Sequence, residues 1–313
     1  MLQLLLRRLA LTIPIVVLAS FLVFGLILLV PGDPAITLAG DNATEEQIEV
    51  IRDRLGLDDP VLVQYGRWAS DAVTGDLGDS LYSGRSVTKS IGERLPVTLS
   101  LAGLSILIAI MIAVPAGIIA ARRGTWVDST ATVGASLGLA MPNFWLGAVL
   151  ALVFALRLGW LPATGYVPLT ENPVDWLRHL LLPAITLGAA AAAETTRQLR
   201  SSLSDVLGQD YIRTARAAGI RSRVVVLKHA LKNATMPVIT VMGFQVAFLL
   251  GGSVIVEQLF ALPGLGGLAI RAVLDRDLPV IQGVVLFTTT LVVLINLGVD
   301  LLYGWLNPKV RSA

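Results

Sequence analysis

The sequence predicts an all-helical membrane protein with six transmembrane helices and a small extracytoplasmic domain after the first helix. Of its 313 residues, 55% are hydrophobic and only 15% are charged, whereas soluble domains carry about 25% charged residues. Mean hydropathy is +0.75. The apolar residues gather into long uncharged stretches, and about 20 apolar residues are enough to cross a bilayer. One polar segment, residues 31–95, separates the first of these stretches from the others.

Six stretches qualify as transmembrane helices by length and composition. The fourth is short, but Glu194, Arg197 and Arg200 follow it and indicate that the helix continues beyond the membrane surface. In chain order the predicted spans are residues 9–30, 97–121, 129–156, 179–193, 238–256 and 280–306.

The polar segment 31–95 is expected to form the extracytoplasmic domain. It holds twelve acidic and six basic side chains. A helix is predicted to begin at Asp41 and Asn42 and to end at Gly56, since small polar residues favour helix starts and glycine favours helix ends. The chain therefore divides into a first transmembrane helix (1–30), this domain (31–95) and a five-helix core (96–308).

Orientation follows from the distribution of Lys and Arg, which concentrate in cytoplasmic loops. The segments predicted to be cytoplasmic hold fourteen of them, and the two short external loops hold four. The segment 31–95 is long enough to be translocated despite its bases. Both termini are therefore expected to be cytoplasmic.

The longest basic segment between spans, residues 210–232, lies within the predicted cytoplasmic loop 197–236. Its pattern predicts two short helices with a break at Gly219, which tolerates the positive φ of a sharp turn. Ser222 is expected to cap the second helix, and Pro237 to open the next apolar run. A helix–glycine–helix unit favours docking to a soluble partner; the alternative is a solvated basic loop. Small, mostly uncharged residues share one face of the first helix: Tyr211, Thr214, Ala215 and Ala218.

Several chemistries are excluded or disfavoured. The chain has no cysteine, and its two histidines, His179 and His229, are isolated, so thiolate, disulfide and histidine-cluster metal chemistry are not expected. None of the four lysines follows a glycine, so no Walker A loop is possible. The ionisable groups near the spans lie at their ends, which disfavours proton coupling. We therefore expect no catalytic residues, no metal and no cofactor in this chain.

Several motifs resemble a known family. YIRTARAAG and HALKNATMP are similar to the cytoplasmic EAA loop of ABC importer permeases, in the dipeptide, oligopeptide and nickel branch. VPGDP (30–34), GDLGDSLYSGRSV (75–87) and residues 256–283 resemble the same branch. Arg213-Thr214-Ala215 stands where many families have Glu-Ala-Ala. The resemblance implies that the ATPase is contacted by Tyr211, Arg213, Thr214, Ala215, Arg216, Ala218 and Gly219.

The translocation path has two sets of candidates. The resemblance implies that Glu257, Phe260, Pro263 and Gly264, after the fifth span, face the path or its outer gate; a turn-rich external loop is the alternative. Polar side chains within spans are costly against lipid, which makes cavity candidates of Asn143, Gln245 and Asn296. Their alternative role is hydrogen bonding between helices.

The resemblance implies the first of two membrane subunits of a type I ABC importer for short peptides, in the inner or plasma membrane of a bacterium or archaeon. Expected partners are a homologous permease, two ATPase subunits that bind ATP and Mg²⁺, an extracytoplasmic substrate-binding protein and membrane lipid, but no nucleic acid. One alternative is the same machinery for nickel chelate, glutathione or another small solute. The other is an ATP-independent channel or secondary carrier.

Overall fold

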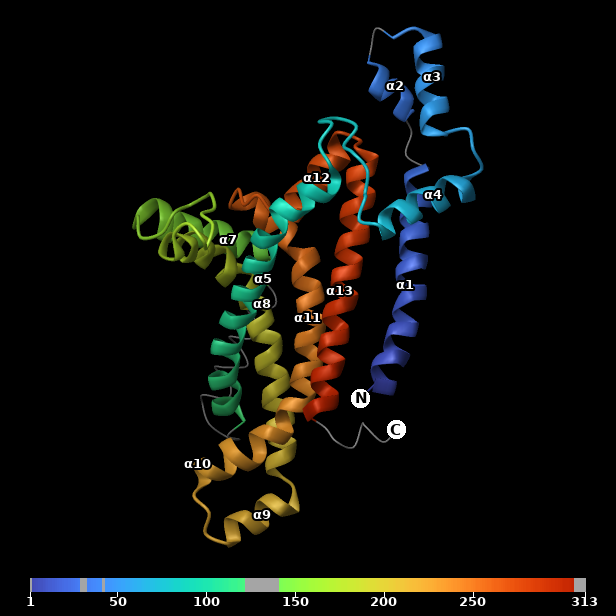
Figure 1. The fold of residues 1–313 in the computed structure, drawn as a ribbon. Coiled ribbons are helices and arrows are strands. Elements are labelled where there is room, and N and C mark those ends of the chain that lie inside the picture. The colour runs from blue at the N-terminus through green and yellow to red at the C-terminus, as the bar shows by residue number, and fades with distance from the viewer. Residues whose placement is uncertain (1, 29–32, 41–42, 122–140, 307–313) are drawn as a thin grey trace. The chain divides into compact units, whose positions relative to one another are not determined.

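The computed structural model describes residues 2–28, 33–40, 43–121 and 141–306 (Figure 1). Within the described residues the regular secondary structure is helical, with one isolated β-bridge between Asp79 and Ser86. The elements are α1 (Leu2–Leu28), α2 (Pro34–Ala39), α3 (Glu45–Leu55), α4 (Val61–Val73), α5 (Val87–Ala120), α7 (Asn143–Leu150), the π-helix η1 (Ala151–Arg157), α8 (Pro173–Leu207), α9 (Asp210–Ala217), α10 (Ser222–Val224), the π-helix η2 (Val225–Ala230), α11 (Leu231–Leu259), α12 (Leu265–Leu274) and α13 (Leu278–Leu306). The predicted all-helical class is confirmed.

Four helical segments within the described ranges are long and apolar enough to cross a membrane. They are residues 87–120, 173–207, 222–259 and 278–299. The predicted first span coincides with most of α1. Only the second part of the predicted third span is described, as α7 and η1, because residues 122–140 lie outside the described ranges. Six spans therefore stay a prediction.

Three predicted starting points differ from the helix starts in the structure. The fourth helix begins at Pro173, before His179, because Asn172 caps it by accepting hydrogen bonds from the backbone N–H groups of Val174 and Asp175. It then runs to Leu207, as the polar residues after 193 indicated. Pro237 lies inside α11, since neighbouring groups in transmembrane helices can satisfy the backbone that proline frees. The third difference is at Ser222, in the basic segment, where the helix cap is Arg221 instead.

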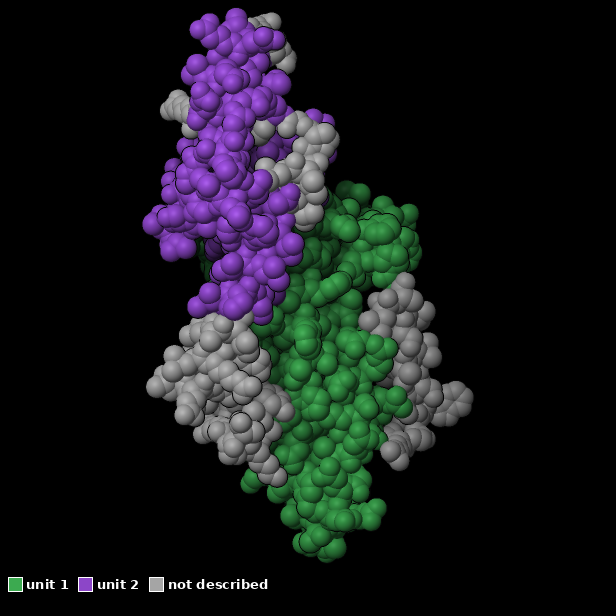
Figure 2. All heavy atoms as spheres, turned by 90° about the vertical axis from the view of Figure 1, so that its right-hand side faces the viewer, with its two compact units in different colours: residues 1, 97–262, 294–313 green, residues 2–96, 263–293 purple. Residues whose placement is uncertain are grey.

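The chain forms two compact units (Figure 2). Unit 1 comprises residue 1, 97–262 and 294–313; unit 2 comprises 2–96 and 263–293. The division differs from the predicted boundaries because residues 263–293 pack with the N-terminal part of the chain.

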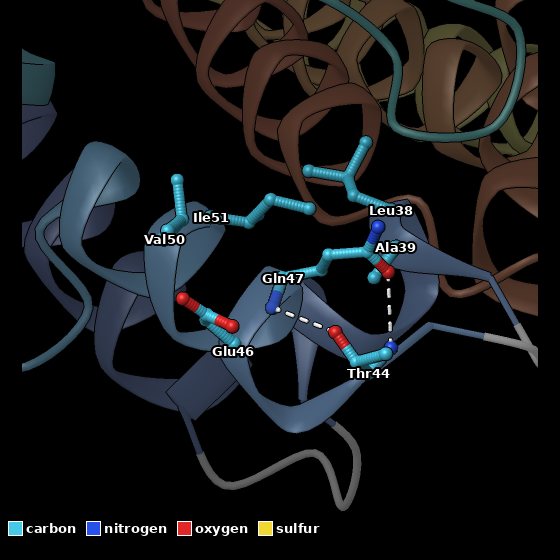
Figure 3. Close-up of a pocket in the computed structure, with 7 residues that line it drawn as sticks. All are labelled: Leu38, Ala39, Thr44, Glu46, Gln47, Val50 and Ile51. Atoms are coloured by element: carbon cyan, nitrogen blue, oxygen red, sulfur yellow. Dashed lines mark hydrogen bonds between the residues drawn. The ribbon is translucent and has the colours of Figure 1, made fainter.

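In unit 2, α3 has a reciprocal cap. Thr44 Oγ1 accepts from the N–H of Gln47 at 3.3 Å, and the Thr44 N–H donates to Gln47 Oε1 at 3.0 Å (Figure 3). The cap is therefore Thr44, and the predicted start at Asp41 and Asn42 lies outside the described residues. Gly56 ends the helix at φ +61°, as predicted.

Another contact in unit 2 joins segments far apart in the sequence. Buried Asp277 accepts from the Ser80 hydroxyl and, at 3.1 Å, from the Leu81 N–H. Its carboxylate thus holds the loop before α5 against the turn before α13. An apolar core surrounds this region: Leu77, Val87, Ile91, Leu265, Leu268, Ala272, Val280 and Val284.

In unit 1, parts of α5, α8 and α11 build the core. Large apolar residues fill one region, among them Leu101, Leu187 and Phe260. Elsewhere the helices approach through small residues. A Cβ at Gly188 of α8 would lie 2.7 Å from the backbone oxygen of Ser105 in α5. Ala109, Ala191 and Ala192 form a small buried cluster of their own.

Candidate functional site

The basic segment folds as a helix, a glycine turn and a second helix. α9 ends at Ala217, and Gly219 takes φ +77° as predicted. Arg221, not Ser222, is the cap of the second helix, and it makes no side-chain cap bond. That second helix is not short, because α10, η2 and α11 continue as one helical run of 38 residues, 222–259.

α9 is fixed to the fold by its inner face. Ile212 is fully buried among Leu203, Val225 and Ala230. Sequence reasoning missed this anchor, although Ile212 is the one large aliphatic side chain in an otherwise polar and small helix. Asn233 Nδ2 of α11 adds a hydrogen bond of 2.7 Å to the Tyr211 hydroxyl. α9 is therefore tied to the same helix that continues into the fifth predicted span.

The outer face of α9 is exposed. Thr214 and Ala218 are both exposed, and Tyr211 is 40% exposed; Ala215 packs partly against the core. Arg213 forms an exposed ion pair with Asp210 at 3.4 Å. Figure 1 shows α9 beyond the lower end of α8. This face offers a short, mostly uncharged surface beside basic side chains.

A second feature is a pocket of about 190 Å³ between α7, α8 and α11. It brings together two of the predicted path residues, Asn143 and Gln245. Spacings of three and four residues place one face of α8 and one face of α11 on it. Its lining residues are Asn143, Leu187, Ala190, Ala191, Glu194, Gln245, Phe248 and Leu249.

Hydrogen bonds orient Gln245 at this pocket. Its Nε2 donates to the Ala191 carbonyl at 3.3 Å, and its Oε1 accepts from the Thr195 hydroxyl at 3.2 Å. The alternative role, bonding between helices, therefore applies to Gln245 as well as pocket lining. Asn296, the third polar candidate, is half-buried on α13 and does not line this pocket.

The four candidates for the outer gate fall in both compact units. Glu257 and Phe260 are each 1% exposed inside unit 1. Glu257 Oε1 accepts from Thr98 at 2.8 Å and from Ser253 at 3.1 Å, two partners that sequence reasoning missed. Pro263 and Gly264 belong to unit 2, where Gly264 precedes α12. Their gate role stays a prediction.

Helices long and apolar enough to cross a membrane, a small, partly polar pocket and an exposed helix turn fit a membrane transport subunit. Two family descriptions match the chain: "binding-protein-dependent transport system inner membrane component" over residues 113–312, and the N-terminal component of the same systems over residues 1–102. The chain belongs to this family. It is a permease subunit of an ATP-driven importer rather than an enzyme, and a multi-pass bacterial inner-membrane protein.

Relatives that match almost the whole chain include a peptide permease and a glutathione permease. A putative peptide transport system permease of Brucella abortus is 46% identical over 312 residues, covering 99% of both chains. The glutathione transport system permease GsiC of Escherichia coli K12 is 45% identical over 312 residues, again with 99% coverage of both. These matches confirm the expected peptide branch of the ABC importer permeases.

The fold is also found in a solved structure. A chain of the inward-facing MetNI methionine ABC transporter superposes with a TM-score of 0.57 at 18% identity. The match covers 69% of this chain and 96% of that one. At this identity the similarity concerns the fold alone.

Proposed function

We propose that this permease forms half of the translocation path of a short-peptide importer. The proposed class of cargo, short peptides, is supported by the full-length identity of 45–46% to peptide and glutathione permeases. Glutathione is the second candidate cargo for the same reason, and it is itself a small peptide. The proposed partners are a homologous permease, two ATPase subunits that bind ATP and Mg²⁺, and an external substrate-binding protein.

The exposed face of α9 is the proposed contact with an ATPase subunit. Ile212 and Tyr211 tie α9 to the helical run 222–259, which also carries Gln245 and Phe248 at the pocket. At 1.5 Å per residue such a run is about 57 Å long. Movement of α9 would thus be transmitted to the pocket along one continuous helix, which suits a rigid-body transition between two states.

An import assay tests this function. Proteoliposomes holding this permease with the second permease and the ATPases of its own system should accumulate a labelled di- or tripeptide when given ATP and the binding protein. Omission of ATP should abolish uptake. Uptake of glutathione but not of other peptides would select the second candidate. Uptake without ATPases, together with their absence from mild-detergent pull-downs, would contradict the proposal.

The proposed orientation places both termini and α9 in the cytoplasm. Because the chain has no cysteine, single cysteines report topology directly. Asp59 and Ser222 both lie on the protein surface. Asp59→Cys should react with an impermeant maleimide once the outer envelope is opened, and Ser222→Cys only after the inner membrane is permeabilised. Equal labelling of both before permeabilisation would contradict the orientation.

A further inference from the structure

The described lining of the pocket between α7, α8 and α11 includes an ionisable side chain, Glu194. Among the eight described residues that line it, Glu194 alone carries a charge; Asn143 and Gln245 are amides and the others are apolar. Its volume of about 190 Å³ is below the roughly 300–1,000 Å³ of pockets that enclose a whole drug-sized ligand. The pocket therefore fits one end of a peptide rather than all of it.

The charge of Glu194 is available to a ligand. Its present partner is Arg197, one helical turn further along α8, and both side chains are partly exposed, at 37% for Glu194 and 58% for Arg197. Exposed ion pairs of this kind add little to stability. Arg197 does not line the pocket. An incoming cation can therefore replace Arg197 beside the Glu194 carboxylate, and the carboxylate then still faces a positive charge.

The amides complete a site for an ammonium group. Gln245 is oriented by its bonds to Ala191 and Thr195, and a carbonyl oxygen with two lone pairs can accept a second hydrogen bond. Asn143 supplies another amide oxygen. An ammonium group has three N–H donors and no acceptor, whereas a peptide carboxylate would be repelled by Glu194. Leu187, Phe248 and Leu249 offer apolar contacts to the first side chain of the peptide.

We propose that this pocket receives the α-ammonium end of a peptide during its passage, with Glu194 as the specificity-determining residue and Arg197 as its competitor. The inference rests on the proposed peptide function. It assigns opposite effects to the two charged residues: loss of Glu194 weakens the attraction for a cation, and loss of Arg197 strengthens it. A purely structural ion pair would give the same effect for both.

Thiol labelling of the assembled complex tests the charge of the pocket. Ala190→Cys places a thiol on the lining, and mass spectrometry of this chain reports its reaction with an ethylammonium thiosulfonate and with a neutral methyl thiosulfonate. Glu194→Gln should lower the ratio of the two rates by roughly two- to fivefold, the scale of a unit charge a few ångströms away in water. Arg197→Gln should raise it. Equal ratios in all three backgrounds would overturn the proposal.

A transport assay then tests whether the pocket recognises the free ammonium group of a peptide. A dipeptide with a free amino group and its N-acetylated form are compared at concentrations that saturate the binding protein with each. Glu194→Gln should reduce uptake of the free-amino peptide several-fold more than that of the acetylated one, and Glu194→Asp should restore part of the difference. Equal losses for both peptides would overturn the inference. If the unmodified complex imported neither peptide, the peptide function would fail instead, and the labelling ratio would still report the pocket.

Discussion

Replacing Gly188 by alanine should destabilise the permease markedly. The added Cβ would lie 2.7 Å from the backbone oxygen of Ser105 and 3.4 Å from Ile108. A backbone atom cannot rotate away as a side chain can, so α5 and α8 must separate. Overpacking of this kind typically costs about 1–3 kcal/mol. The free energy of unfolding in detergent, measured by chemical or thermal denaturation, should fall by that amount.

Gly103→Ala is the matched control. Gly103 lies in α5, the helix that Gly188 of α8 approaches, and a Cβ there meets nothing within 4 Å. Alanine favours helix by about 1 kcal/mol over glycine, so this change should leave stability unchanged or raise it slightly. The same loss of stability in both variants would show that α5 and α8 do not depend on close approach at Gly188.

The importance of Gly188 comes from the way membrane helices associate. Small residues let two backbones approach closely where hydrophobic burial gives little drive. Residues 188–193 read as one glycine followed by five alanines, and three of the small residues at this contact are Ala109, Ala191 and Ala192. From the sequence this run was predicted only to be part of an apolar span. The signal was present, but its partner helix could not be read from local pattern.

Features set by local chemistry were predictable. Gly56 and Gly219 both take the positive φ that glycine favours, and polarity alone selected Asn143 and Gln245, which the structure brings to one pocket. The spacing from Leu187 to Glu194 also marks one face of α8. Glu194 was nevertheless read only as a sign that the helix leaves the membrane.

Features set by distant contacts were not predictable. Thr98 and Glu257 are 159 positions apart, and so no periodicity links them. Asp277 and Ser80 are 197 positions apart, and their bond helps to explain why residues 263–293 pack with the N-terminal part. Pro237 was predicted to open an apolar run; proline often marks a helix boundary, but α11 continues through it.

Replacing Gly219 by valine should uncouple the permease from its ATPases while leaving membrane insertion intact. Gly219 has φ +77°, and a Cβ there would meet nothing within 4 Å, so the whole penalty comes from the backbone conformation. A β-branched residue is an outlier at positive φ, and such strain costs about 1–3 kcal/mol. If the turn relaxes to avoid it, α9 changes its angle to α10.

The expected loss of ATPase docking in Gly219→Val follows from the size of the backbone strain. If docking requires the present turn, a strain of about 1–3 kcal/mol lowers the equilibrium constant for ATPase docking by roughly 5- to 150-fold. Recovery of ATPase subunits with the tagged permease should fall accordingly, and ATP-driven uptake should fall with it. Membrane levels should stay normal, because insertion depends on apolar spans that the substitution leaves unchanged.

Gly219→Asn separates the effect of backbone conformation from that of simply adding a side chain. Asparagine enters the left-handed region far more readily than valine, and the space around the Cβ is open, so this variant should keep most ATPase recovery and uptake. Arg216→Ala, which removes an exposed charge from α9, should do less than Gly219→Val. Normal recovery and normal uptake in Gly219→Val would contradict the hinge role, because the strain would then have no route to the ATPase contact. Equal losses in the valine and asparagine variants would place the sensitivity in the surface of the turn rather than in its φ angle.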